Sequence, residues 1–352
     1  MEIKATFAPY ELNFKQASGT SRGILNSKTS YFIKLKTSNS VGFGECGLLK
    51  GLSYDNLDEY EAKLQWVCDH IELGVDALWE LLTEFPSIQF GVEQAFLSLH
   101  SSEPFLLFPS AFTKGEDKIC MNGLVWMGSE EFMRQQIDRV LEGGFNCVKM
   151  KIGAIEWEKE LHLLQTLRKR YDKSTLEIRV DANGAFNLKS AQKVLEQLAV
   201  LGVHSIEQPI GADFQEDLAL LCAQTPVAIA LDESLIPCIS AEQKSQLLDF
   251  VKPQYIILKP SFIGGFRGSD YWISLAKDRG IGWWATSALE SNVGLNAISQ
   301  WVYTKGNNMP QGLGTGSLYT NNISSPLYVK NGAIAYEPNL AWDLQKIDSL
   351  CM

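Results

Sequence analysis

Three acidic residues recur at a nearly constant spacing, and each of them ends a short apolar run. Asp181 and Glu207 are 26 residues apart, and Asp232 follows Glu207 after 25 more. The run Val227–Leu231 before Asp232 is typical of a buried strand. A period of this length suits one strand, one helix and two turns. It therefore predicts a parallel barrel, with the three acids at the carboxyl ends of its strands, where barrel enzymes carry their catalytic groups.

Lysines stand on both sides of the acidic set. Lys149 and Lys151 end the apolar run that begins at Cys147, and Lys259 follows a later run. Side chains alternate along a strand, so Lys149 and Lys151 share one face, as do Arg179, Asp181 and Asn183. We expect two adjacent lysines inside a barrel to lower each other's pKa, and partial burial to lower it further. A neutral amine of this kind can act as a general base.

The acids indicate a metal site, and the lysines indicate the reaction that the metal would assist. Asp181, Glu207 and Asp232 are hard oxygen donors suited to Mg²⁺, with Mn²⁺ as a substitute. Histidine and cysteine are missing from these positions, which disfavours zinc. A divalent ion beside a lysine base indicates abstraction of a proton next to a carboxylate, because the resulting dianion needs a nearby cation.

The pattern of elements divides the chain into three parts. Residues 1–105 contain alternating strand patterns followed by helical periodicity, which predicts an α+β domain. Strand and helix patterns alternate across residues 116–320, from a first strand at Cys120–Leu124 to an eighth near Gln311–Gly314. Residues 321–352 leave this period, and we expect them to return to the first domain. The expected fold class is α/β.

The composition narrows the class of function. The 352 residues carry a net charge of −10 without a dense Lys/Arg run, which disfavours nucleic acid or an anionic membrane as a partner. No apolar stretch reaches the length of a membrane span, and the first residues lack the pattern of a secretory signal. Seven scattered cysteines without a Cys-x-x-Cys pair predict reduced thiols and a cytoplasmic location. The oligomeric state stays open.

The ordered motifs resemble a known group of enzymes. They are Lys149-x-Lys151, Asp181-x-Asn183, Glu207-Gln208-Pro209, Asp232-Glu233-Ser234 and Lys259-Pro260-Ser261. This order resembles the muconate-lactonizing subgroup of the enolase superfamily, whose members use a Lys or His base and Mg²⁺. The resemblance implies a modified (β/α)7β barrel with an N-terminal α+β capping domain that the C-terminal tail completes.

Three further features resemble one family within that subgroup. Arg179, the loop Thr20–Gly23 and the segment Ser287–Gly294 look most like o-succinylbenzoate synthases. Those enzymes dehydrate 2-succinyl-6-hydroxy-2,4-cyclohexadiene-1-carboxylate to o-succinylbenzoate on the route to menaquinone. The resemblance thus implies a hydro-lyase that acts on a small carboxylate.

The same resemblance implies roles for individual residues. Lys151 would abstract the α-proton, and Lys259 would remain cationic and stabilise the enediolate. Asp181, Glu207 and Asp232 would hold Mg²⁺. The residues expected around these groups are Lys149, Arg179, Asn183 and Glu233. The residues expected to contact the substrate are Arg22, Ser287, Ser291 and Ser317.

Other functions fit the same charged groups. A dipeptide epimerase or an N-acylamino acid racemase would use the two lysines on opposite faces of the substrate, and muconate cycloisomerisation is a further option. The segment Gly312–Gly316 lacks the acidic pair that would bind a substrate ammonium group, which disfavours a dipeptide. A barrel that binds a metal and a ligand without catalysis would not need both Lys151 and Lys259.

Overall fold

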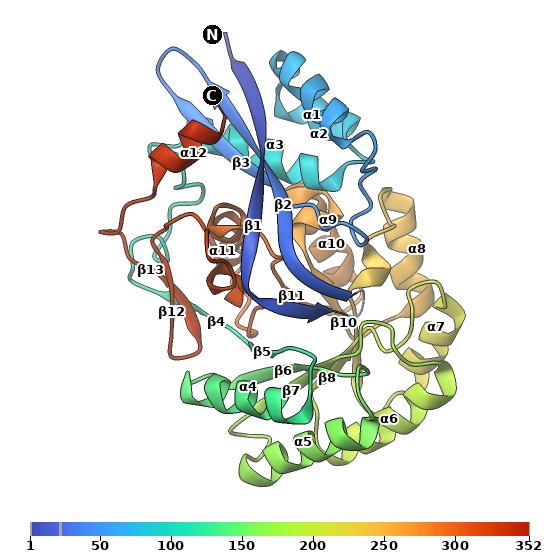
Figure 1. Ribbon diagram of the computed structural model, residues 1–352. Helices are drawn as coiled ribbons and strands as arrows, with labels where there is room; N and C mark the ends of the chain where they lie inside the picture. The colour runs from blue at the N-terminus through green and yellow to red at the C-terminus, as the bar shows by residue number, and fades with distance from the viewer. Residues whose placement is uncertain (1, 21–22, 352) are drawn as a thin grey trace.

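A parallel sheet of seven strands is the largest sheet in the computed structural model, which describes residues 2–20 and 23–351 (Figure 1). The sheet curls, and its strands follow one another in space in the order of the sequence. These strands are β5 (Gly123–Val125), β6 (Cys147–Lys151), β7 (Glu177–Asp181), β8 (Ser205–Glu207), β9 (Ala228–Leu231), β10 (Tyr255–Leu258) and β11 (Gly282–Ala285). Sequential parallel neighbours require the crossover helices that the sequence predicted.

The two edges of this sheet are linked by a very short segment. Gln311 forms a parallel bridge with Met121, just before β5, and Gly312 forms one with Thr286, just after β11. These bridges lie where the sequence predicted an eighth strand. The segment stays short because its glycines offer no side chains to pack on a pleated surface, which is the basis of strand preference.

Helices on the outside of the sheet cover its apolar outer face. Val148, Val180 and Ile206 point outward from successive strands and are fully buried beneath them. The side chains of Asn187 and Ser240 cap the first turns of two of these helices, which sets where they begin. The helices are α4 (Glu130–Glu142), α5 (Trp157–Arg170), α6 (Leu188–Val200), α7 (Gln215–Gln224), α8 (Ala241–Val251), α9 (Pro260–Ile263), α10 (Gly265–Asp278) and α11 (Asn292–Thr304).

The N-terminal part combines an antiparallel sheet with helices. Strands β1 (Lys4–Thr20), β2 (Gly23–Lys36) and β3 (Val41–Cys46) pair in that order, and α1 (Tyr60–Asp69), α2 (Gly74–Leu81) and α3 (Pro86–His100) follow. The α3 backbone lies directly on β3, because a Cβ atom on Gly44 would come 1.9 Å from the Gly91 carbonyl oxygen. On its other side α3 reaches the helices that cover the parallel sheet, where Glu93 accepts a hydrogen bond of 2.6 Å from the Phe266 amide of α10.

The strand expected at Cys120–Leu124 is wrong as a single element. It is interrupted at Met121 and Asn122, whose amides bond to Gly332 and Gln311. The first half becomes β4 (Lys118–Cys120) in a separate antiparallel sheet with β12 (Leu327–Lys330) and β13 (Ala333–Tyr336). Only the second half, β5, joins the parallel sheet. Hydrogen bonds from distant segments decide this interruption, and the local apolar pattern does not contain them.

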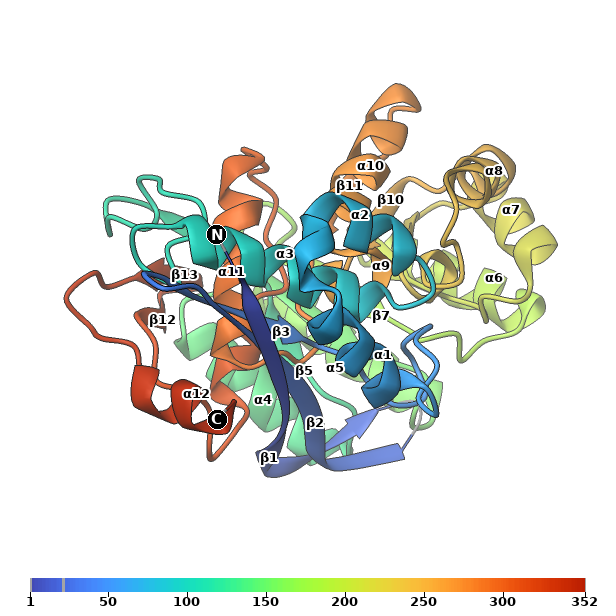
Figure 2. The same ribbon diagram turned by 90° about the horizontal axis from the view of Figure 1, so that it is seen from above.

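The C-terminal helix α12 (Leu344–Leu350) packs against the N-terminal sheet, on the other side of β1 and β2 from α1 (Figures 1 and 2). The Lys34 ammonium lies 2.6 Å from the Asp348 carboxylate, and Ile347 is buried with Phe32. The limits of the three expected domains stay predictions. No helix in the described part of the chain is long and apolar enough to cross a membrane.

Candidate active site

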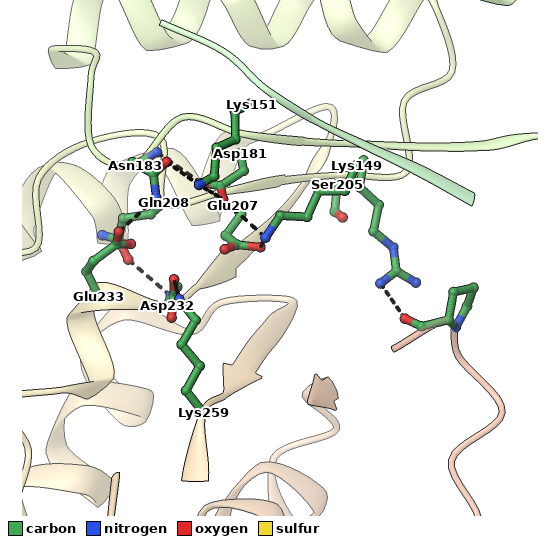
Figure 3. A network of polar contacts seen from close by, with 12 residues as sticks. Lys149, Lys151, Asp181, Asn183, Ser205, Glu207, Gln208, Asp232, Glu233 and Lys259 are labelled. Atoms are coloured by element: carbon green, nitrogen blue, oxygen red, sulfur yellow. Dashed lines mark hydrogen bonds and ion pairs between the residues drawn. The ribbon is translucent and has the colours of Figure 1, made fainter. Parts of the chain in front are cut away.

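The charged residues singled out from the sequence meet at one end of the parallel sheet. Lys151, Asp181 and Glu207 are direct neighbours across β6, β7 and β8. Asp232 and Lys259 come immediately after β9 and β10 (Figure 3). The carboxyl ends of parallel strands point the same way, so the period seen in the sequence becomes proximity in space.

Each carboxylate in this group is paired with an ammonium group. The Lys149 Nζ atom lies 3.1 Å from Asp181 Oδ2 and 2.6 Å from Glu207 Oε2. The Lys151 Nζ atom lies 2.9 Å from the same Asp181 oxygen, and Lys259 donates to Asp232 Oδ2. The three lysines and three acids therefore form one buried network of ion pairs.

The expected lowering of the Lys149 pKa is wrong. Burial disfavours its ammonium form, but Asp181 and Glu207 outweigh burial and raise the pKa of Lys149 above its usual value. Asp232 and Glu233 likewise raise the pKa of Lys259 despite its burial. The sequence showed two like charges on one strand, whereas the structure places carboxylates of the neighbouring strands against them.

The three acids differ in their ionisation. Burial opposes ionisation of Asp181, but Lys149 and Lys151 more than offset it and hold its pKa below the usual range. Burial, together with the charge of Asp181, raises the pKa of Glu207 to about 8. Burial also raises the pKa of Asp232, although Lys259 opposes the shift. The network thus carries fewer negative charges than its three carboxyl groups suggest.

The donor set suits a divalent ion, but it is not gathered into a ready-made site. Glu207 Oε1 is buried and has no hydrogen-bond partner, so this oxygen can accept a cation. Yet no group of three His, Cys, Asp or Glu side chains among the described residues lies close enough to hold a metal ion. The carboxylates are turned toward the lysines instead. A divalent ion would provide the compensation that the ammonium groups now provide.

Polar residues at the strand ends hold this network in place. Asn183 accepts a hydrogen bond of 2.6 Å from Lys151 and donates one of 2.9 Å to Glu233. Asn183 adopts a φ of 45°, a left-handed conformation that asparagine tolerates better than most residues. The side chain of Gln208 connects the loops after β8 and β9 by accepting from the Asp232 amide at 3.2 Å. Gln208 belongs to the Glu-Gln-Pro motif, but the sequence alone indicated no role for it.

Arg179 lies one layer below the acids. Its Nε atom donates to Glu177 at 2.6 Å, one Nη atom donates to the Pro310 carbonyl at 2.9 Å, and the guanidinium lies 4.1 Å from the Trp284 ring centre. These partners lie at the start of β7, just before Gln311 and on β11. Arg179 is buried on the inner face of the curled sheet, as strand alternation predicted, but alternation did not show which way the long side chain turns.

A cavity of about 480 Å³ opens above the network. Ser287 and Ser317 line it, as expected for substrate contacts. Ser291 does not, because its hydroxyl donates to Glu45 at 2.5 Å and accepts from the Val293 amide, which caps α11. Arg22 lies outside the described residues. The charged residues that line the cavity are Lys50, Lys149, Lys151, Asp181, Glu233 and Lys259.

Several cavity residues were not predicted. Trp126 follows β5, and its ring lies 6.0 Å from the Lys151 Nζ atom. Its place two residues after Leu124, on the same strand face, was the available signal. Leu25 and Leu49 bring the N-terminal part to the cavity wall. Nothing in their local sequence distinguishes them from other apolar residues, since only the packing of the N-terminal part on the rest of the chain places them there.

Comparison with known proteins agrees with this arrangement. A family model described as enolase C-terminal domain-like matches residues 132–339, more than half of the chain. The o-succinylbenzoate synthase of Desulfotalea psychrophila is 44% identical over 363 residues, covering 94% of this chain and 98% of that protein. This chain belongs to the enolase superfamily and to its o-succinylbenzoate synthase family. Members of the superfamily use a divalent metal ion, typically Mg²⁺.

Solved structures of this superfamily share the fold. The crystal structure of MenC from Desulfotalea psychrophila has a TM-score of 0.84 and 39% identity, covering 95% of this chain and 99% of that one. A dipeptide epimerase from Enterococcus faecalis, crystallised with Mg and the dipeptide L-Leu-L-Tyr, has a TM-score of 0.82 over 96% of this chain and 97% of that one. Its 18% identity supports the shared fold and nothing finer. The predicted membership of the enolase superfamily is confirmed.

Proposed function

We propose that this protein dehydrates 2-succinyl-6-hydroxy-2,4-cyclohexadiene-1-carboxylate to o-succinylbenzoate. The observation that carries the proposal is the 44% identity to an o-succinylbenzoate synthase along nearly the whole chain. The charged network supports it, since a lysine base beside three acids suits removal of a proton next to a carboxylate. The product is aromatic, which favours the elimination thermodynamically.

Lys151 is the base in this proposal. Its amine takes the proton from the ring carbon that bears the carboxylate, and the electron pair of that C–H bond moves toward the carboxylate. The same lysine, now an ammonium, gives the proton to the hydroxyl on the adjacent ring carbon. The C–O bond breaks and water leaves, while the electron pair returns from the carboxylate to form the double bond between the two ring carbons. Asn183, 2.6 Å from the Lys151 Nζ atom, orients the amine.

The charge that develops on the substrate needs cations on both sides. A divalent ion held by Asp181, Glu207 and Asp232 would stabilise the negative carboxylate when bound. Lys259 remains protonated, because Asp232 and Glu233 raise its pKa, and it stabilises the enediolate from the other side of the cavity. Lys149 stays an ammonium group and keeps Asp181 and Glu207 aligned.

The succinyl arm carries a second carboxylate, which needs hydrogen-bond donors. Ser287 and Ser317 line the cavity, and Thr286 beside them has a buried hydroxyl without a hydrogen-bond partner. The exposed Lys50 supplies a positive charge at the same cavity. We assign the succinyl arm to this side of the cavity. We assign Ser291 no role in binding the arm.

A dipeptide epimerase is the second candidate, since it would use Lys151 and Lys259 as opposed bases. The segment Gly312–Gly316 holds no acid to bind a substrate ammonium group. The dipeptide epimerase compared above is a distant relative. We therefore favour a substrate without an amine.

Two finer features belong to the proposal. The bridges at Gln311 and Gly312 support a closed (β/α)7β barrel, and the contacts of Leu25 and Leu49 support a capping role for the N-terminal part. The seven cysteines, all free among the described residues, support work in the reducing cytoplasm.

The proposal is tested by incubating the purified protein and Mg²⁺ with the cyclohexadiene substrate and following the ultraviolet absorbance of the aromatic product. Turnover that stops in excess chelator is expected. Absence of product, combined with epimerisation of dipeptides in the same preparation, would reject the dehydration in favour of the second candidate.

A further inference from the structure

Leu289, in the wall of the substrate cavity, has an unusual backbone conformation. Its φ is 64°, in the left-handed region, although it carries a bulky side chain. Leucine enters this region only against steric repulsion between its Cβ atom and the backbone. Strain of this kind persists where surrounding contacts over-determine the conformation, and such places are often functional. The contacts around Leu289 are therefore informative.

The Leu289 carbonyl is held by two side chains from distant parts of the chain. The Lys28 Nζ atom donates to it at 2.8 Å, and the Tyr319 hydroxyl donates to it at 2.7 Å. Lys28 also donates to the Ala288 carbonyl at 3.2 Å. Lys28 lies on β2, so a residue of the N-terminal sheet donates hydrogen bonds to two consecutive carbonyl groups in the loop after β11.

Buried carboxylates hold the same loop on both sides of Leu289. Glu290 accepts from the Ala288 amide at 2.6 Å, and Glu45 of β3 accepts from the Ser291 amide at 2.8 Å. Both carboxylates are completely buried. Acids thus hold the amides of Ala288 and Ser291, and Lys28 holds the carbonyls of Ala288 and Leu289.

A lysine in this buried position is energetically unfavourable. Lys28 is 5% exposed, and its hydrogen bonds to Ala288 and Leu289 go to backbone carbonyls. Burial lowers its pKa, while Glu290 and Glu45 oppose that shift through their charges. An ammonium group buried among neutral acceptors lowers the stability of the fold. Such a residue is therefore expected where its contacts serve another purpose. The hydrogen bonds of Lys28 to the loop after β11 indicate this purpose.

We propose that Lys28 is a positioning residue for the substrate cavity, which holds Leu289 in its left-handed conformation and so fixes the wall formed by residues 286–289. This inference rests on the proposed function, in which that wall contacts the succinyl arm. Lys28 acts through Leu289 and the adjacent carbonyl, and touches neither the acids nor Lys151 and Lys259. It couples the N-terminal sheet to substrate binding and not to the chemical step.

The test compares Lys28→Met with Lys34→Met. Lys34 lies on the same strand, is also buried and pairs with Asp348 on α12, away from the cavity. We expect Lys28→Met to raise KM for the cyclohexadiene substrate by roughly tenfold with kcat within about twofold, because a left-handed residue released from its contacts relaxes. Lys34→Met is expected to leave KM unchanged. Equal KM values for the two variants, or a loss of Lys28→Met confined to kcat, would overturn the assignment.

A second variant separates positioning from a general packing defect. Glycine adopts the left-handed conformation without strain, so Leu289→Gly removes the need for the Lys28 contact. The effect of Lys28→Met on KM should therefore fall to about twofold or less in the Leu289→Gly background. If the two effects on KM are instead independent, Lys28 does not act through Leu289.

Amide hydrogen exchange tests the contact without any substrate. We expect the amides of residues 288–291 to exchange at least tenfold faster in Lys28→Met than in Lys34→Met. This measurement does not depend on activity. If the wild-type protein forms no o-succinylbenzoate, the proposed function is rejected, but faster exchange in Lys28→Met still supports the contact between Lys28 and the loop. Unchanged exchange in an active protein would overturn the contact alone.

Discussion

Lys151 and Asp181 lie opposite each other on β6 and β7, with the Lys151 Nζ atom 2.9 Å from Asp181 Oδ2. One is the proposed base and the other a proposed metal ligand, so the two roles are coupled. An ammonium group held by a carboxylate cannot accept a proton. A divalent ion bound to Asp181 would share this carboxylate with the Lys151 ammonium group.

Replacement of the proposed base should stop chemistry without unfolding the protein. Lys151→Ala is expected to lower kcat for dehydration by a factor of about 10³ or more, within the range lost when a general base is removed. Exchange of the substrate α-proton with deuterated solvent, followed by NMR, should disappear as well. Lys159→Ala changes an exposed lysine paired with Glu156 and serves as the control. Persistent α-proton exchange in Lys151→Ala would reassign the base.

Neutralising a proposed ligand should remove the response to metal. Asp232→Asn keeps the volume of the side chain but removes the charge, so we expect Mg²⁺-dependent turnover to be lost while the circular dichroism spectrum is kept. The measurement is activity against Mg²⁺ concentration. Asp213→Asn, at an exposed position, should behave like wild type. Full activity of either protein in excess chelator would contradict the metal assignment.

A buried carboxyl group in the N-terminal part predicts a pH-dependent stability. Asp55 Oδ1 accepts hydrogen bonds from the Ser87 amide and hydroxyl, and burial raises the pKa of Asp55 to about 7. Between about pH 4 and pH 7 the folded state keeps a proton that the unfolded state releases, so this group lowers stability as pH rises. Above pH 7 its contribution is constant.

Asp55→Asn should remove this dependence, because the amide stays neutral and keeps the oxygen that Ser87 contacts. We expect the free energy of unfolding of the variant, relative to wild type, to increase by up to about 4 kcal/mol between pH 4 and pH 7. Urea denaturation at both pH values measures it. Asp58→Asn changes an exposed acid nearby and is the control. A difference between variant and wild type that is equal at both pH values would show that Asp55 ionises normally.

The contact between α3 and β3 predicts a strict requirement for glycine. Gly44→Ala would place a Cβ atom 1.9 Å from the Gly91 carbonyl oxygen, and backbone cannot move aside as a flexible side chain can. We expect a loss of about 3 kcal/mol in the free energy of unfolding, measured by urea denaturation. Gly314→Ala, where nothing lies within 4 Å, should cost far less. Equal losses would mean that α3 can shift away from β3.

Local patterns in the sequence predicted the parallel sheet well, because strand and helix periods are short-range properties. They located β6 and placed Lys149 and Lys151 on its inner face. They did not predict the interruption at Met121 and Asn122. That break depends on hydrogen bonds to residues about two hundred positions later in the chain.

The residues of the candidate site were likewise predicted only in part from the sequence. The sequence placed Ser291 among the substrate contacts because small polar residues in a loop look alike. In the folded chain Ser287 lines the cavity, while Ser291 binds Glu45 and caps α11. Only the path of the loop distinguishes the two hydroxyl groups.

The sequence by itself determined which charged residues share one end of the sheet, because the acids and lysines recur with the period of a strand and a helix. Only the tertiary structure decided which of them are paired, and therefore that the pKa of Lys149 is raised and not lowered. It also decided that Lys28 grips the Leu289 carbonyl across 261 residues of sequence. Charge pairing and buried hydrogen bonds depend on distances of a few ångströms between distant segments, and no local pattern encodes those distances.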